Sequence, residues 1–179
     1  MMNVILDSNE VTKTLRRLAH EVIENYVDLN NLVIIGIVTR GEFLAKRLHQ
    51  IIKQIENVDI PYGYLDVTLY RYDLDHRKSI KQSKPSVIPS INNKNVLLVD
   101  DVLYEGRTIR AALDAIKDFG RPISVKLLVL IDRGLRKLPI RADFTGKTIT
   151  TTPKQIVKVN ILEIDNKDSI EIQEVEVKV

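Results

Sequence analysis

The chain of 179 residues contains no cysteine. This absence excludes disulfides, thiolate metal ligands and a cysteine nucleophile. No apolar run approaches the roughly 20 residues that a membrane-spanning helix needs, and the N-terminus, Met1-Met2-Asn3-Val4, lacks the pattern of a signal peptide. We therefore expect a cytoplasmic protein without a membrane segment.

A strong excess of one charge is also missing. The formal net charge is only +3, which permits binding to nucleic acid but does not argue for it. The composition, 44% hydrophobic and 28% charged, is ordinary for a globular protein. Because the length suffices for one core and there is no internal repeat or linker, we expect a single domain over residues 1–179.

The most informative stretch covers residues 95–108. Apolar residues 96–99 lead directly into Asp100 and Asp101, and a helical pattern follows Gly106. The short, β-branched apolar run predicts a strand buried on both faces. The next apolar positions have helix spacing: Ile109, Ala112, Leu113, Ile116 and Phe119. The stretch therefore predicts a strand, a loop and a helix.

Such a loop can bind an anion. A helix N-terminus offers free backbone N–H groups and the positive end of the helix dipole, and phosphate is the common occupant. Gly106 allows close approach of the backbone, while Arg107 and Thr108 can add a charge and a hydroxyl. Asp100 and Asp101 lie at the ligand edge of an open α/β sheet, where they could hold ribose hydroxyls or Mg²⁺. The alternative is an aspartate pair that caps a surface loop.

Two further segments have the same strand-then-helix organisation. Residues 32–38 form a buried-strand pattern that ends at Thr39-Arg40-Gly41 before a helix, which predicts a second anion site. Residues 124–131 form another buried-strand pattern. Asp7 and Glu10 have capping-box spacing, so we expect a helix from about Ser8. Together these patterns predict an α/β fold with a mostly parallel sheet and helices on both faces.

The remaining segments predict smaller features. Residues 65–70 alternate like a strand, and the polar segment 71–89 is either a lid over the site or disordered, with Arg71 at its base within reach of a diphosphate. Residues 156–161 and 170–179 alternate like antiparallel strands. We expect them to add an antiparallel edge or a small flap, or hood, over the site.

Residues 95–108 resemble the phosphoribosyl-pyrophosphate (PRPP) loop of type I phosphoribosyltransferases, although Glu105 stands where the first Thr of the phosphate cradle is usual. The wider chain looks like the family of bacterial pyrimidine-operon attenuation regulators. The similar segments are 17–21, 39–41, 66–71, 100–104, 132–134 and 138–144. Leu135, Lys137 and Tyr72 replace a His, a Glu and an Asp that are usual in that family.

The resemblance implies two activities. One converts uracil and PRPP to UMP and diphosphate with Mg²⁺; the other is UMP-promoted binding to the leader mRNA of the pyrimidine operon, which favours termination. Asp100, Asp101, Arg40 and Arg71 would be catalytic, with Mg²⁺ held through the two aspartates and the substrate diphosphate. PRPP or UMP would contact Thr39, Arg40, Gly41, Asp100, Asp101, Tyr104, Glu105, Gly106, Arg107, Thr108 and, at the base, Phe144 and Thr145. The family often has a non-proline cis peptide in the diphosphate turn, expected here at Thr39–Arg40.

Two basic clusters are candidates for RNA binding. Arg16, Arg17 and His20 share one polar helix face, and Arg133, Arg136, Lys137 and Arg141 form a second cluster. Transferase chemistry requires neither. If the fold or a homo-oligomer (a dimer or larger) brings them together, they make a phosphate-binding surface without aromatic stacking residues. We predict RNA contacts at Arg16, Arg17, His20, Arg136 and Arg141; the alternative for the first cluster is a solvated basic face.

Two other functions stay open. A carboxylate at Glu105 would repel the phosphate dianion by a Coulomb energy on the order of 1 kcal/mol or more. The protein could then be an RNA-binding regulator with little or no transferase activity. Alternatively, because related purine enzymes share the fold, it could be a purine-type phosphoribosyltransferase without RNA binding.

Overall fold

The structure is a computed structural model that describes residues 2–71 and 83–174. Most of the expected lid, the Tyr72 departure and the last residues of the expected C-terminal strand lie outside the described residues. Among the described residues, no helix is long and apolar enough to cross a membrane.

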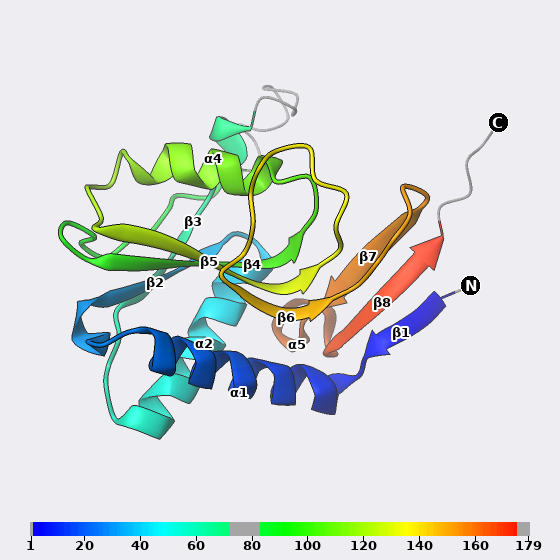
Figure 1. The fold of residues 1–179 in the computed structure, drawn as a ribbon, viewed down its shortest axis with the longest axis horizontal. Helices are drawn as coiled ribbons and strands as arrows, with labels where there is room; N and C mark the ends of the chain where they lie inside the picture. The colour runs from blue at the N-terminus through cyan, green and yellow to red at the C-terminus, as the bar shows by residue number, and fades with distance from the viewer. Residues whose placement is uncertain (1, 72–82, 175–179) are drawn as a thin grey trace.

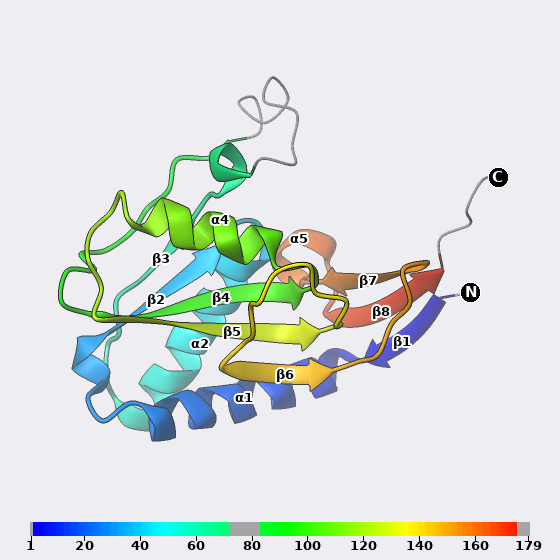
Figure 2. The ribbon, with the colours of Figure 1, turned by 45° about the horizontal axis from the view of Figure 1, so that its top comes forward.

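The main sheet has five parallel strands; the buried apolar runs predicted the three at residues 32–37, 95–103 and 124–132, but not the two outer strands. Their order is β3 (Tyr62–Leu65), β2 (Leu32–Ile37), β4 (Asn95–Leu103), β5 (Ser124–Asp132) and β6 (Phe144–Thr148). Every residue of β2 is buried. Because all five strands run the same way, their carboxyl ends meet at one edge of the sheet (Figure 2).

Helices cover both faces of this sheet, which confirms the predicted α/β class. α1 (Ser8–Asn25) and α2 (Arg40–Glu56) pack on one face, and α4 (Arg107–Ile116) packs on the other (Figure 2). α1 begins as predicted: the Asp7 carboxylate accepts from the Glu10 N–H at 2.9 Å, and the Glu10 carboxylate accepts from the Asp7 N–H at 2.9 Å. Each face therefore has its own apolar core.

A second, antiparallel sheet lies beyond the carboxyl ends of the main strands (Figure 1). It contains β1 (Met2–Leu6), β8 (Ser169–Glu174) and β7 (Gln155–Asn160) in that order, with the short helix α5 (Leu162–Asp165) between β7 and β8. The C-terminal strands thus form the expected hood rather than an edge of the main sheet. β1, which the sequence did not predict, completes it.

The expected strand at residues 65–70 was wrong beyond Leu65. Asp66 stops it, because its carboxylate accepts from the N–H of Thr68 at 2.8 Å, from the Thr68 hydroxyl and from the N–H of Lys84. Such bonds offer the backbone an alternative to sheet pairing. The chain turns instead into a short 3₁₀ helix at Thr68–Tyr70, which brings Arg71 toward the main sheet's carboxyl edge.

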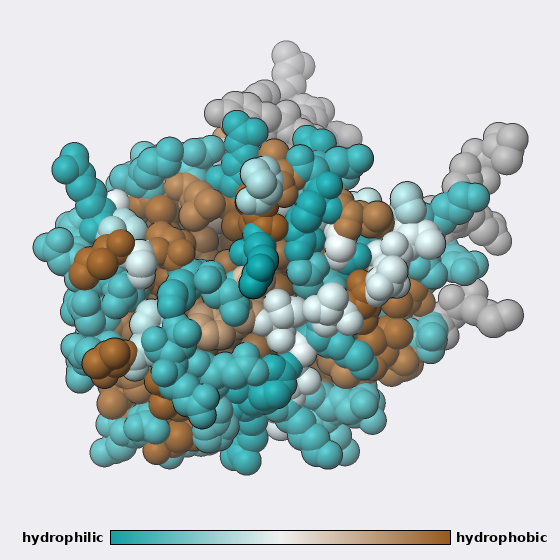
Figure 3. All heavy atoms as spheres, viewed as in Figure 1, coloured by the Kyte–Doolittle hydropathy of each residue, from teal (hydrophilic) through white to brown (hydrophobic). Residues whose placement is uncertain are grey.

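The predicted apolar stripe after residue 108 is shorter than expected. α4 ends at Ile116, so Phe119 lies in the following turn, and Phe119 and Leu113 are each 39% exposed. Apolar side chains are visible on the surface around α4 (Figure 3). The buried face of α4 is therefore formed by Ile109, Ala112 and Ile116 together with Ala111 and Ala115.

Candidate active site at the carboxyl edge of the sheet

Asp100 and Asp101 lie within β4 rather than just after it. The pairing of β2 with β4 stops at Gly36 and Val99, whereas β4 continues beside β5 as far as Leu103. The aspartates therefore occupy the part of β4 that has lost one neighbouring strand. Asp100 is only 7% exposed, and its carboxylate accepts from the N–H of Asp101 at 2.9 Å.

Burial shapes the charge of this pair. Burial, followed by the neighbouring Asp101, raises the pKa of Asp100 well above its ordinary value, and burial also raises the pKa of Asp101. The charges of Arg71 and Arg40 oppose these shifts at Asp100 and Asp101, respectively. A buried carboxylate beside a second, partly buried one becomes more favourable when a ligand brings further positive charge or hydroxyl donors.

The donor chemistry fits a hard cation shared with a phosphorylated substrate. Mg²⁺ prefers oxygen ligands and is usually bound through one or two carboxylates together with substrate phosphates and water. Within the described residues, no three His, Cys, Asp or Glu side chains are grouped as a metal site. Asp100 and Asp101 could thus contribute to such a site, but the substrate would have to complete it.

The Thr39-Arg40-Gly41 turn lies directly against the acidic strand. α2 begins at Arg40 with Thr39 as its N-cap, so helical amides face this edge of the sheet. A Cβ on Gly41 would lie 2.4 Å from the carbonyl oxygen of Val99, which shows how closely the turn packs on β4. The cis peptide precedes the expected bond: it joins Val38 to Thr39, because the bond after Thr39 already leads into α2.

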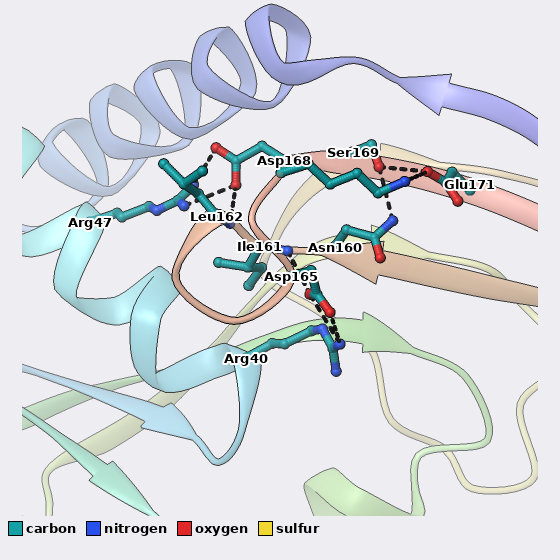
Figure 4. A network of polar contacts seen from close by, with 10 residues as sticks. Arg40, Arg47, Asn160, Ile161, Leu162, Asp165, Asp168, Ser169 and Glu171 are labelled. Carbon is teal, nitrogen blue, oxygen red and sulfur yellow. Dashed lines mark hydrogen bonds and ion pairs between the residues drawn. The ribbon is translucent and has the colours of Figure 1, made fainter.

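The hood contacts this turn at Arg40. The Arg40 guanidinium donates to both carboxylate oxygens of Asp165 at 3.2 Å, while its buried Nε has no hydrogen-bond partner (Figure 4). The Ile161 N–H and then Arg40 lower the pKa of Asp165. Arg47 binds Glu163 and also Asp168, whose contact is drawn in Figure 4, and these pairs fix the rest of the α5 turn on α2. Sequence reasoning missed Asp165, because only the position of the second sheet places it here.

The loop between β4 and α4 forms the second anion site. Gly106 has the left-handed backbone angle φ of 95°, which favours glycine, and it is the N-cap of α4. Residues 102–109 and Arg71 line a cavity of about 270 Å³, and Nη1 of Arg71 lies 3.4 Å from the Thr108 hydroxyl. The loop and Arg71 thus line one cavity, and the acidic pair lies just before the loop in β4.

Glu105 does not stand alone in this loop. Its carboxylate accepts from Nε of Arg107 at 2.7 Å, and its side chain is 26% exposed. The pair offsets the negative charge that distinguishes this loop from the usual cradle.

The predicted base contact at Phe144 must be corrected. Phe144 is 5% exposed and belongs to the core between the sheet and helices α1 and α2. It pairs with Leu128, which is level with Val99, and its ring is packed in that core. The Thr145 carbonyl accepts from Arg17 at 3.4 Å. We therefore leave Phe144 out of the proposed base site, whereas Thr145, which is level with Asp100 through Val129, stays a prediction.

The predicted RNA residues divide into two groups. Arg16, Arg17 and His20 are exposed on α1, where Arg17 also pairs with Glu21 and donates to the Gly146 carbonyl of β6. Arg141 is likewise exposed. Arg136, however, is engaged by backbone carbonyls and by Asp132.

Arg133, from the same predicted basic cluster, is 6% exposed, and its guanidinium lies over the Tyr104 ring at 4.1 Å. The second basic cluster is therefore not one exposed surface.

A parallel sheet whose carboxyl edge carries an acidic pair between two anion-binding turns is the arrangement of a phosphoribosyltransferase. Residues 2–164 match the phosphoribosyl transferase domain family, and the chain belongs to that family. The fold agrees: a hypoxanthine phosphoribosyltransferase of Trypanosoma cruzi superposes with a TM-score of 0.70 at 18% identity, covering 97% of each chain.

Within this family the chain belongs with the bifunctional PyrR proteins. It is 50% identical to the bifunctional protein PyrR of Microcystis aeruginosa over 94% of this chain and 95% of that protein. It is 52% identical to the bifunctional protein PyrR of Alkaliphilus metalliredigens over 94% of this chain and 93% of that protein.

Proposed function

We propose that this protein makes UMP and diphosphate from uracil and PRPP, and that it regulates pyrimidine-operon attenuation by binding leader mRNA when UMP is present. The observation that carries the transferase activity is the position of Asp100 and Asp101 between the 39–41 turn and the 104–108 loop. The proposal predicts UMP formation from uracil and PRPP in Mg²⁺ buffer. An absence of turnover with any base would refute it.

The chemistry needs no covalent nucleophile. A bond forms between N1 of uracil and C1′ of the ribose, the bond from C1′ to the diphosphate oxygen breaks, and N1 loses its proton. Positive charge develops at C1′ and negative charge on the diphosphate, and fixed charges stabilise both. Mg²⁺ bound with the diphosphate would neutralise part of the leaving-group charge.

Each proposed residue has a role in holding the substrate. The amides of the 39–41 turn and the side chains of Arg40 and Arg71 hold the diphosphate. The Asp100 and Asp101 carboxylates accept from the ribose hydroxyls and from metal-bound water. The 104–108 loop, with the Thr108 hydroxyl, holds the 5′-phosphate. Because the reacting groups are fixed at both ends of the ribose, much of the rate enhancement comes from orientation.

Replacing Glu105 by Thr tests whether the unusual loop is impaired. Because the Arg107 guanidinium already offsets the Glu105 carboxylate, we expect the variant to change kcat/KM for UMP formation by less than about fivefold, or about 1 kcal/mol. Steady-state kinetics with PRPP as the varied substrate would measure this.

Arg107→Met provides the complementary variant, because it leaves the Glu105 carboxylate unpaired beside the phosphate. Its KM for PRPP should rise more than that of Glu105→Thr. A gain of a hundredfold or more in Glu105→Thr would instead favour the alternative of a regulator with a disabled transferase site.

The basic side chains near the β5–β6 edge support the RNA-binding proposal. Arg17 on α1 touches the β6 backbone at Gly146. Arg141 lines a groove with Lys126 of β5, and Lys126 contacts Asn25 at the end of α1. We propose that RNA phosphates bind along this edge and that a homo-oligomer repeats it symmetrically.

Arg17→Ala and Arg141→Ala should each weaken binding of a pyrimidine-operon leader hairpin about tenfold and reduce its salt dependence. The kcat for UMP formation should stay within about twofold of the native value. Filter binding over a range of salt concentrations, with and without UMP, measures the effect. Because Arg17 also contacts Gly146, the melting temperature of the Arg17→Ala protein must be measured as well. Unchanged affinity in both variants would place the RNA site elsewhere.

A further inference from the structure

We infer that Arg136 is a positioning residue for the 5′-phosphate loop, and that residues 133–138 form a backing segment that aims the loop's amides at the ligand. The inference rests on the proposed function of residues 104–108 as the 5′-phosphate site. It assigns Arg136 a role different from the RNA contact that its charge suggested.

The backing segment binds three successive carbonyl oxygens, one at the end of β4 and two in the loop. The Leu103 carbonyl accepts from the N–H of Arg133 at 3.1 Å. The Tyr104 carbonyl accepts from Nη1 of Arg136 at 2.9 Å. The Glu105 carbonyl accepts from the N–H groups of residues 137 and 138 at 3.0 and 3.2 Å. All three carbonyls are therefore turned toward residues 133–138.

This arrangement determines where the amides point. In a trans peptide, the N–H of one residue points opposite to the carbonyl of the residue before it. Carbonyls of 103, 104 and 105 that face the backing segment therefore direct the N–H groups of Tyr104, Glu105 and Gly106 away from it. Three such amides, followed by the free N–H groups of the first turn of α4, form a concave anion site.

Arg136 joins the parts of this backing segment. Besides Tyr104, its guanidinium donates to the Ile140 carbonyl at 2.9 Å and to the Gly134 carbonyl at 3.3 Å, and it pairs with the Asp132 carboxylate. It thereby links the ends of β4 and β5 to the turn before β6. A planar guanidinium with five donors can serve these acceptors together, whereas a lysine ammonium cannot.

The side chains of the backing segment also contact the loop. A Cβ placed on Gly106 would lie 3.4 Å from Leu138 and 3.4 Å from Ile140, so the loop rests on both residues. The Arg136 side chain is only 23% exposed. Its charge is used to hold the loop backbone, which leaves little of it for a phosphate of RNA.

Arg136→Met tests the inference because it keeps much of the stem and removes all five donors. We expect the dissociation constant for ribose 5-phosphate to rise at least tenfold by calorimetry, while that for Mg²⁺–diphosphate, bound at the 39–41 turn, changes less than twofold. The KM for PRPP should rise about tenfold with kcat within threefold, because the phosphate is held equally in the ground and transition states. Arg136→Lys should recover only part of the affinity.

Arg121→Met is the matched control, since Arg121 is exposed and lies outside both sites; both dissociation constants should stay native. If Arg136→Met does not fold, Asp132→Asn removes one anchor of the same guanidinium and should raise the ribose 5-phosphate constant about threefold. Native ribose 5-phosphate affinity in the folded Arg136→Met protein, or an equal loss for diphosphate, overturns the inference. A native protein that binds ribose 5-phosphate but forms no UMP would contradict the proposed transferase and leave this inference intact.

Discussion

Asp100→Asn is expected to make the free protein more stable while removing most of its transferase activity. The native carboxyl is almost fully buried beside a second carboxyl, and its raised pKa shows that ionisation is unfavourable there. An amide of the same shape removes that cost, so we expect Tm to rise by about 2–4 °C, the shift that about 1 kcal/mol gives in a domain of this size. Loss of the carboxylate that accepts from the ribose hydroxyls and the metal-bound water should lower kcat about 10²–10³-fold.

The stability gain should depend on pH. A raised pKa means that folded protein binds the proton more tightly than unfolded protein, whose aspartates titrate near about 3.9. The native free energy of unfolding therefore falls as pH rises from about 4 through the raised pKa of Asp100, and this loss is absent in Asp100→Asn. The two proteins should have similar stability below about pH 4 and differ most above the folded pKa.

Asp114→Asn is the control for this pair of effects. Asp114 is partly exposed on α4 and pairs with Lys117, so its replacement should leave kcat near the native value and lower Tm slightly or not at all. Thermal melts from pH 4 to 8 and UMP assays on the three proteins measure both quantities. A destabilised Asp100→Asn protein at neutral pH, or one that retains native kcat, would contradict the assigned role.

Gly41→Ala should disrupt the diphosphate turn through backbone contact alone. The added Cβ would lie 2.4 Å from the Val99 carbonyl oxygen and 3.3 Å from Cα of Asp100. Neither backbone atom can rotate away, so the start of α2 must shift from β4, at a cost of about 1–3 kcal/mol. A displacement of the catalytic geometry near 1 Å can cost about 10²-fold in rate, so kcat/KM for PRPP should fall about that much.

Gly41→Ala should weaken binding of the opposite ligand from the one that Arg136→Met affects. Its dissociation constant for Mg²⁺–diphosphate should rise at least tenfold, whereas that for ribose 5-phosphate should stay within twofold. Lys46→Ala, an exposed change in α2, controls for a general effect on the helix. Native diphosphate affinity in Gly41→Ala would show that this turn does not hold the diphosphate.

Local patterns in the sequence were sufficient for the three central strands of the main sheet and for the two turns that follow residues 32–37 and 95–103. The apolar runs before Asp100 and Thr39 predicted strands buried on both faces, and each was followed by helix spacing. Parallel strands place their carboxyl ends at one edge, which is why the acidic pair and the 39–41 turn, each at the end of such a strand, lie together in the structure. The capping box at Asp7 is equally local, since both bonds join residues three apart.

Tertiary structure decided the remaining features, because each depends on a partner distant in sequence. An apolar ring such as Phe144 can either pack in a core or stack on a nucleobase. Only its observed packing against α1 and α2 shows that it belongs to the core. From the sequence alone, Arg136 is expected to be a surface cation. The structure shows that it binds the carbonyls of Leu103 and Tyr104, which lie more than 30 residues earlier in the chain. Asp165 meets Arg40 across 125 residues, and no local pattern predicts that contact. The sequence by itself determined which strands and turns form the site; the long-range packing decided which charged side chains face the ligand and which only hold the backbone that does.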